Sequence, residues 1–245
     1  MIISVIIEAR SASTRLPKKV LQNAINKISF LEYLVLRLKT LDFIDNIIVA
    51  TTTNKDDNEI VKISKKCKVK YYRGSEKNVL IRVINASKKF KTDLIIRVTS
   101  DCPVIDTDII YQAYKLFINN DIDFVSNAHI RSYPVGMDVE IFKSKILYKS
   151  VKYAKTPSDK EHITLAIRNN PKIFKQLNLV APKNLFMPKL GLTLDYKEDM
   201  ILLRKIINKF KNKKYNCIDI LNYLSKNKKL LKINNKVKRT KYSTV

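Results

Sequence analysis

The chain has 245 residues, of which 45% are hydrophobic and 29% charged, and its formal net charge is +26 at pH 7. These proportions are those of a globular protein with a sizeable core, which excludes a disordered or fibrous chain. No run reaches the roughly 18 apolar residues of a membrane-spanning helix, and the apolar amino terminus has no basic leader or cleavage site. Three scattered cysteines indicate neither disulfides nor a zinc site, so we expect a cytoplasmic protein with no membrane partner.

The positive charge suggests a nucleic-acid partner, because clustered lysines bind phosphate backbones through counterion release. Lysine is instead spread along the whole chain beside many isoleucines and asparagines, a pattern that biased codon usage alone can produce. We therefore interpret most of the charge as solvated surface. A non-catalytic nucleic-acid-binding protein that uses the basic segment after Lys226 stays open as an alternative.

Short β-branched runs alternate along the chain with longer segments of helical period. This alternation predicts an α/β fold with a Rossmann-like, mainly parallel sheet. The expected strands cover residues 2–8, 47–51, 69–72, 94–98, 124–126 and 192–194, and the expected helices cover residues 25–41, 56–67, 78–90, 106–119, 146–154, 161–169 and 198–210.

The middle and the end of the chain depart from this alternation. Residues 137–142 alternate apolar and polar side chains, which predicts a half-exposed strand or a protruding hairpin. The segment from Lys226 onward is basic and polar. We therefore expect a single domain over residues 1–225 and a mobile tail over residues 226–245.

The loop after the first expected strand, residues 8–19, carries four cations and three hydroxyl residues. Arginine offers planar forks of donors, lysine a compact charge, and exposed backbone amides complete a cradle for a polyphosphate. The loop has neither the GxxxxGK[ST] spacing of a P-loop nor the GxGxxG of a dinucleotide-binding fold. A merely basic surface loop is the alternative interpretation.

Two aspartates each follow a short apolar run, although they lie far apart in the sequence. Pro103 ends the strand before Asp101, which places this carboxylate in a turn at the carboxyl end of a central strand, where open parallel sheets bind ligands. Asp195 follows the run at residues 192–194. The two strand ends could converge on one cation, and Mg²⁺ takes few protein oxygens. Either aspartate alone could instead be a helix cap or turn residue.

Seven short motifs occur in order over roughly residues 1–210: residues 7–21, 74–82, 97–103, 126–127, 133–140, 157–164 and 192–199. Together they resemble the sugar-acid cytidylyltransferases of the spore coat polysaccharide biosynthesis protein F type, which are related to the CMP-Kdo and acylneuraminate cytidylyltransferases. Each motif alone is weak, but seven in the right order are specific for the family.

The resemblance implies a glycosyltransferase-A-like fold in which the first loop holds the triphosphate of CTP and the middle hairpin helps form a homodimer. It implies Mg²⁺ on Asp101 and Asp195, and catalytic roles for Lys19, Arg10 and Asp101. The implied nucleotide-binding residues are Ala9, Arg10, Ser13, Arg15, Lys19, Gly74, Arg82 and Asp101. The chain departs from the family pattern at Lys18, where relatives usually carry glycine, and at Asn78, where an acidic residue is common.

The irregular middle region and the segment after it supply the residues expected to bind the acceptor. These are Arg131, Tyr133, Asp138, Glu140 and His162. Arg131 could hold a carboxylate in bidentate fashion, or could be a surface residue. His162 matches a histidine that contacts the sugar acid in related enzymes, yet a lone histidine at a helix start is also a common structural residue. A thiol nucleophile at Cys102 is disfavoured, because no base is evident nearby.

These observations predict an enzyme in which an acceptor oxygen attacks the α-phosphorus of CTP and pyrophosphate departs. Positioning and charge neutralisation would do most of the work. The acceptor is expected to be a sugar acid for surface polysaccharide precursors. A phosphorylated small molecule or a phosphonate stays open as acceptor, and so do UTP or GTP as donor and a family member that binds nucleotide without turnover.

Overall fold

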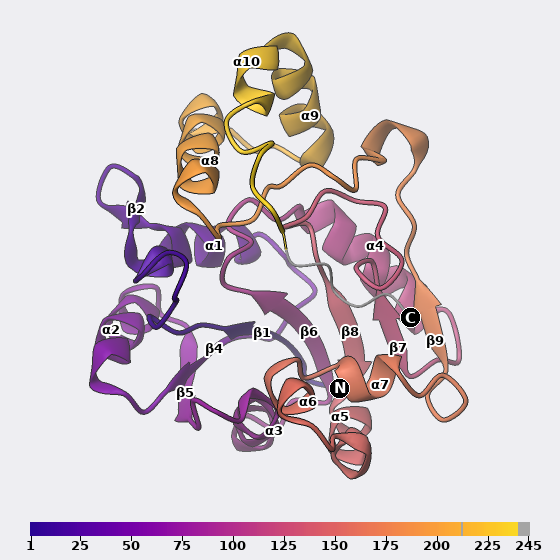
Figure 1. Ribbon diagram of the computed structural model, residues 1–245. Helices are drawn as coiled ribbons and strands as arrows, with labels where there is room; N and C mark the ends of the chain where they lie inside the picture. Colours follow the sequence, from indigo (N-terminus) through magenta and orange to yellow (C-terminus); the bar gives the residue numbers. More distant parts are fainter. Residues whose placement is uncertain (212, 240–245) are drawn as a thin grey trace.

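A seven-stranded sheet forms the centre of the molecule in the computed structural model, which describes residues 1–211 and 213–239 (Figure 1). In the order in which they lie side by side, the strands are β5 (Lys70–Gly74), β4 (Asn46–Thr52), β1 (Ile3–Glu8), β6 (Leu94–Thr99), β8 (Glu140–Lys143), β7 (Phe124–Ser126) and β9 (Gln176–Asn178). The helices are α1 (Phe30–Leu38), α2 (Asn58–Lys66), α3 (Val79–Lys89), α4 (Thr107–Ile118), α5 (Ser144–Ser150), α6 (Pro157–Glu161), α7 (Leu165–Arg168), α8 (Lys197–Phe210), α9 (Cys217–Lys226) and α10 (Lys228–Leu231).

The sheet is mostly parallel, which confirms the predicted α/β class. Strand β1 pairs in parallel with β4 and β6, and β4 pairs in parallel with β5. Strand β8 runs antiparallel to both β6 and β7. Because β5, β4, β1 and β6 point the same way, the loops that follow them meet at one edge of the sheet.

Helices cover both faces of the sheet, so β1 buries side chains on both sides. Val5 and Ile7 belong to the apolar cluster that includes residues of α1, α4, α8 and α9. Ile6 belongs to the second cluster, with residues of α3, α5 and α7. This strand is therefore a near-continuous apolar run, as expected for a parallel strand with two buried faces. None of the helices in the described part of the chain has the length and apolar character needed to cross a membrane.

The helix predicted over residues 25–41 begins later than expected. Residues 23–29 form a two-stranded hairpin, β2 (Asn23–Ile25) and β3 (Ile28–Ser29). Asn26 makes the turn with a φ of 50°, a left-handed conformation that asparagine tolerates better than most residues. The Ser29 hydroxyl then accepts a hydrogen bond from the Glu32 amide and caps α1. Local turn and cap chemistry override the apolar period here.

A strand forms in the segment 137–142 as predicted, but the half exposure expected for it is wrong. Strand β8 lies inside the sheet, between β6 and β7, and Glu140, Ile141 and Phe142 are all buried. Polar residues alternate with apolar ones in this segment because they have charged partners: Asp138 pairs with the half-buried Arg131, and the buried Glu140 pairs with Arg97. Alternation of polar and apolar residues therefore did not indicate solvent exposure.

Three further expectations are corrected near the carboxyl terminus. The strand predicted over residues 192–194 is an irregular turn, next to a single parallel bridge between Val135 and Gly191. The helix predicted over residues 161–169 is interrupted between α6 and α7. The segment from 226 to 239, expected to belong to a mobile tail, includes α10 and the buried Asn234. The folded domain therefore continues past the predicted boundary at residue 225, and residues 240–245 lie outside the described residues.

Candidate functional site

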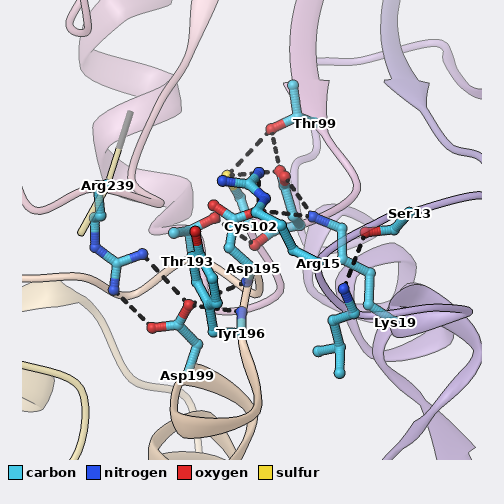
Figure 2. A network of polar contacts seen from close by, with 12 residues as sticks. Ser13, Arg15, Lys19, Thr99, Cys102, Thr193, Asp195, Tyr196, Asp199 and Arg239 are labelled. Atoms are coloured by element: carbon cyan, nitrogen blue, oxygen red, sulfur yellow. Dashed lines mark hydrogen bonds and ion pairs between the residues drawn. The ribbon is translucent and has the colours of Figure 1, made fainter. Parts of the chain in front are cut away.

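Asp101 and Asp195, which the sequence predicts to converge, lie together at the carboxyl edge of the sheet with the Lys19 ammonium between them. Lys19 donates hydrogen bonds to Asp101 Oδ2 at 3.0 Å and to Asp195 Oδ1 at 2.9 Å (Figure 2). Arg15 donates to the same Asp195 oxygen at 2.8 Å, and its guanidinium carbon lies 5.3 Å from the centre of the Tyr196 ring. The first loop thus supplies two cations to a pair of carboxylates that come from distant parts of the chain.

The charges in this cluster stabilise one another. Burial alone would lower the pKa of Lys19, but the charges of Asp101 and Asp195 outweigh it, and the pKa is raised. Burial would likewise raise the pKa of Asp101, but Lys19 and the Thr99 hydroxyl, which donates to Asp101 Oδ1 at 2.6 Å, outweigh it, and the pKa is lowered. Both groups are therefore ionised at neutral pH.

Backbone contacts bring the Asp195 turn to Asp101. The Leu194 amide donates to the Asp101 carbonyl oxygen at 2.8 Å, and the Thr193 hydroxyl donates to the same oxygen at 3.2 Å. Gly136 packs against this turn with a φ of 102°, and a Cβ added to it would lie 2.5 Å from the carbonyl carbon of Leu192. A residue with a side chain would therefore push the turn away.

Asp57 fixes the backbone of the first loop, a role that sequence reasoning missed. The buried Asp57 carboxylate accepts a hydrogen bond from the Ser11 amide at 2.7 Å and another from the Thr52 amide at 3.3 Å. The Lys18 amide donates to the Ser11 carbonyl oxygen at 3.0 Å and closes the loop. The available signal was the aspartate pair Asp56-Asp57 in the loop that follows the expected strand 47–51, which we interpreted only as the start of a helix.

Lys18, which departs from the family pattern of glycine, adopts a left-handed conformation. Its φ is 53° and its ψ is 27°, at the start of the short 3-10 helix Lys19–Leu21. The departure from the family pattern therefore leaves a turn that places Lys19 on the two aspartates, at the cost of some backbone strain. At the other departure, Asn78 caps α3 by accepting from the Ile81 amide at 3.0 Å.

The remaining residues of the expected nucleotide site lie around the loop. Arg10 donates to Glu161 Oε1 at 3.1 Å on an exposed surface. The Ser13 hydroxyl accepts from the Leu16 amide at 3.4 Å, and Ala9 is buried. Gly74 and Arg82 lie against each other: Arg82 is buried, and a Cβ added to Gly74 would lie 3.0 Å from the Arg82 Cγ.

Arg82 is held by the loop after β5. It donates to the Ser75 carbonyl oxygen at 2.6 Å, and its Nε has no hydrogen-bond partner in the described structure. Burial lowers the pKa of this guanidinium. Its Nη1 contact with the backbone indicates a role in fixing the path of that loop.

A small cavity adjoins the aspartate pair. It is lined by Arg97, Thr99, Ala128, Arg131, Asp138, Glu140, His162 and Arg168. Four of the five residues expected to bind the acceptor therefore line one cavity. The fifth, Tyr133, is not among the lining residues: it is buried in the core, its hydroxyl has no hydrogen-bond partner in the described structure, and burial raises its pKa. Thr99 both lines the cavity and binds Asp101, so the two sites share a wall.

The two acids of the cavity hold two of its arginines. Arg97 donates to Glu8 Oε1 and to Glu140 Oε2, each at 2.6 Å. Arg131 donates both nitrogens of its fork to Asp138, at 2.8 and 2.9 Å. Burial alone would raise the pKa of Glu140, but Arg97 outweighs it, and the pKa is lowered. Asp138 and Glu140 therefore orient the side chains of Arg131 and Arg97.

Sequence reasoning missed Arg97 and Arg168 as residues of the cavity. Arg97 was visible as the one charged residue in an otherwise apolar strand, a position that requires interior partners. Arg168 offered no such signal, because it lies in the segment 161–169, which the sequence indicated only as a helix. The pKa of His162 is lowered, mainly by burial, which favours the neutral imidazole at pH 7.

Cys102 has the environment of a structural thiol. It is buried, and burial together with the neighbouring Asp101 raises its pKa well above the ordinary value. A thiol that stays protonated is a poor nucleophile. Its sulfur lies 3.3 Å from the Thr99 hydroxyl.

The donor set at Asp101 and Asp195 fits a magnesium ion. In residues 1–211 and 213–239 no group of three or more histidine, cysteine, aspartate or glutamate side chains could hold a metal. Mg²⁺ needs no such group, because one or two carboxylates suffice when waters and substrate phosphates complete the shell. The Lys19 ammonium between the two carboxylates indicates that this position favours a cation.

The fold defines an α/β protein with a mostly parallel sheet, and comparisons with known proteins identify its family. The family model described as cytidylyltransferase matches residues 4–242. The chain is 31% identical to the spore coat polysaccharide biosynthesis protein SpsF of Bacillus subtilis over 209 residues, which cover 83% of this chain and 85% of that protein. The chain therefore belongs to the cytidylyltransferase family.

Solved structures agree with this membership. A cytidylyltransferase from Leptospira borgpetersenii superposes with a TM-score of 0.90 at 31% identity, covering 99% of this chain and 100% of that one. The CMP:2-keto-3-deoxy-manno-octonic acid synthetase, solved in complex with CTP, superposes with a TM-score of 0.62 at 12% identity, covering 85% of this chain and 99% of that one. The second similarity concerns the fold alone.

Proposed function

We propose that this cytidylyltransferase transfers CMP from CTP to a small anionic acceptor, a sugar acid, and releases pyrophosphate. The observation that carries the proposal is the convergence of Asp101, Asp195 and Lys19 beside a cavity that contains three arginines. The sugar-acid acceptor is supported by the structural similarity to the CMP:2-keto-3-deoxy-manno-octonic acid synthetase. A role in surface polysaccharide precursor synthesis is supported by the similarity to the spore coat polysaccharide biosynthesis protein of Bacillus subtilis.

The first loop would bind the triphosphate of CTP. Lys19, Arg15 and Arg10 carry charges that oppose those of the phosphates, and Asp57 fixes the loop through the Ser11 amide. Asp101 and Asp195 would hold Mg²⁺, which, when bound, neutralises charge on the phosphate oxygens. The proposed nucleotide site contains Ala9, Arg10, Ser13, Arg15, Lys19, Gly74, Arg82 and Asp101. Positioning and electrostatics account for the chemistry, and no covalent nucleophile is needed.

The cavity beside Asp101 would bind the acceptor. Arg97, Arg131 and Arg168 line the cavity with Asp138 and Glu140, and Glu8 also pairs with Arg97, so three cations face three carboxylates. The buried Nε of Arg168 has no hydrogen-bond partner in the described structure, and such a guanidinium donor suits a carboxylate. A phosphate or phosphonate would satisfy the same charges, so these acceptors are alternative outcomes of the experiment below.

A pyrophosphate-release screen tests the proposal. The four nucleoside triphosphates are combined with a panel of ulosonic acids, small phosphates and phosphonates, with Mg²⁺ present or chelated. We expect release only with CTP, a sugar acid and Mg²⁺. Release with a phosphorylated acceptor alone would overturn the sugar-acid assignment, and release with no pair would overturn the enzymatic proposal.

Two variants test whether pyrophosphate release depends on the two aspartates. Asp101→Asn and Asp195→Asn are expected to lower the rate of pyrophosphate release by about 10²-fold or more, the typical effect of removing one electrostatic group. The control is Asp42→Asn, at an exposed position, which should leave the rate unchanged. Full activity in both site variants, with an unchanged circular dichroism spectrum, would exclude the two carboxylates from the reaction.

A homodimer belongs to the same proposal. The loops around β9 carry exposed apolar side chains: Ile130, Val180, Phe186 and Met187, of which Ile130 is 60% exposed. They share one surface, because Asn178 binds the backbone of Ile130 and the Met187 amide donates to the Ser132 carbonyl oxygen. Exposed apolar patches of this kind are typical of protein interfaces.

A further inference from the structure

The carboxyl-terminal segment 228–239 returns to the Asp195 turn, to which it contributes two side chains. Arg239 donates to Asp199 Oδ1 at 2.6 Å, and Asn234 donates to the same oxygen at 2.7 Å. Asn234 also donates to the Gly191 carbonyl oxygen at 2.9 Å. Figure 2 shows Arg239 on Asp199, with Asp195 and Tyr196 next to it and Lys19 on the far side.

Asp199 connects these two side chains to the proposed metal site. Its other oxygen, Oδ2, accepts the amides of Asp195 at 3.1 Å and Tyr196 at 3.0 Å. Asp199 is fully buried, so its charge needs all of these partners. Arg239 is the one cation that the ion pairs of the described residues place on this carboxylate.

Gly191 leaves the room that Arg239 occupies. A Cβ at Gly191 would lie 1.7 Å from Arg239 Nη2, closer than any two unbonded atoms can approach. The glycine has no positive φ that would require it for conformational reasons. Its absence of a side chain therefore serves the approach of the arginine.

We propose that Asn234 and Arg239 are positioning residues that fix the carboxylate of Asp195 for the divalent cation, through Asp199 and the backbone of the turn. Neither residue touches the proposed reacting groups. Without these contacts to Asp199, the turn at residues 190–195 would be free to move. The Asp195 carboxylate would then be positioned only by its ion pairs with Lys19 and Arg15, and its geometry for binding a metal would be less well defined. Partners in this outer position typically change metal affinity by about 10- to 100-fold. The effect on metal binding rests on the proposed function, whereas the contacts of Asn234 and Arg239 with Asp199 do not.

Hydrogen exchange measures the positioning itself, without any ligand or activity. We expect Arg239→Ala and Asn234→Ala to speed amide exchange in residues 190–199 by about tenfold or more, with exchange in β1 and β4 unchanged. Gly191→Ala should reproduce the effect, because it displaces the arginine. Lys238→Ala removes the same charge from the neighbouring exposed position and should change nothing.

The Mg²⁺ concentration for half-maximal pyrophosphate release measures the consequence. We expect it to rise about tenfold in Arg239→Ala, with the Michaelis constant for the acceptor unchanged, and to recover partly in Arg239→Lys. Unchanged exchange in residues 190–199 would overturn the proposal. So would faster exchange with an unchanged Mg²⁺ requirement, since a merely structural contact behaves in that way.

The two proposals fail in different ways. If the wild-type chain releases pyrophosphate with no pair of substrates, the proposed function is overturned, while hydrogen exchange still decides whether the segment fixes the turn. If Arg239→Ala does not fold, Gly191→Ala and Asn234→Ala, which keep every charge, give the same two measurements.

Discussion

At the scale of single residues, the site depends on charges that a folded chain must compensate. Lys19 lies between Asp101 and Asp195, and each of these groups would be costly to bury alone. Removing one carboxylate leaves the lysine with a single partner. The geometry therefore makes the stability of this edge of the sheet dependent on pH.

The pH dependence has a definite sign. The pKa of Asp101 is lowered in the folded chain, so its contribution is present above the ordinary value of about 3.9 and is lost as the pH falls through the folded value. The pKa of Lys19 is raised, so its contribution is present below about 10.4 and is lost as the pH rises through its folded value. The interaction is therefore fully present across the neutral range.

Denaturant unfolding of the wild type and Asp101→Asn between pH 2 and pH 8 tests this sign. We expect the wild type to lose free energy of unfolding faster than the variant below about pH 4, so that the difference between the two shrinks. A difference that stays constant over the acid range would show that Asp101 does not carry the interaction.

Backbone strain at Lys18 gives a second prediction at this scale. Lys18→Gly should raise the free energy of unfolding by up to about 1 kcal/mol, because glycine adopts a positive φ without strain. The matched control is Lys27→Gly, at an exposed position with no positive φ, where glycine should only lower stability. Equal effects of the two substitutions in denaturant unfolding would contradict the assignment.

At the scale of elements, the site is assembled by irregular segments rather than by the regular strands. The turn at residues 190–195 binds the Asp101 backbone, the bridge at Val135 and the carboxyl-terminal segment. Gly136 allows these segments to approach because it adds no atom between them.

Gly136→Ala is therefore expected to lower the free energy of unfolding by about 2 kcal/mol or more, from backbone strain and from the clash with Leu192. The control is Gly74→Ala, whose new Cβ would meet only the side chains of Tyr72 and Arg82, which can move. Thermal denaturation of both variants measures the contrast. A smaller loss in Gly136→Ala than in Gly74→Ala would mean that the turn yields easily.

At the scale of the whole molecule, the exposed apolar surface around β9 determines the proposed assembly. Phe186→Asp and Val180→Asp place charges on that surface and should convert a homodimer to a monomer, as measured by light scattering. Ile201→Asp, at an exposed apolar position on α8, serves as the control. A monomeric wild type would refute the homodimer and leave the proposed chemistry intact.

The large positive charge belongs to the same scale. The part of the basic tail that the structure describes packs on the domain, through Asn234 and Arg239. Together with membership of the cytidylyltransferase family, this packing favours the enzyme over a dedicated nucleic-acid-binding protein.

The sequence by itself determined the α/β class, most of the strands and the pairing of the first loop with Asp101 and Asp195. These features follow from local signals: apolar periods, turn residues and charges placed at strand ends. The family resemblance followed from the order of the motifs, which can be read from the sequence without knowledge of the tertiary structure.

Only the tertiary structure decided which polar residues are interior. Glu140 helped to give its segment the pattern of a half-exposed strand, yet Arg97, from β6, pairs with it inside the protein. Arg239 was likewise indistinguishable from its basic neighbours until it met Asp199. A charged residue is stable in the interior only when a partner distant in sequence compensates it, and a local pattern contains no information about that partner.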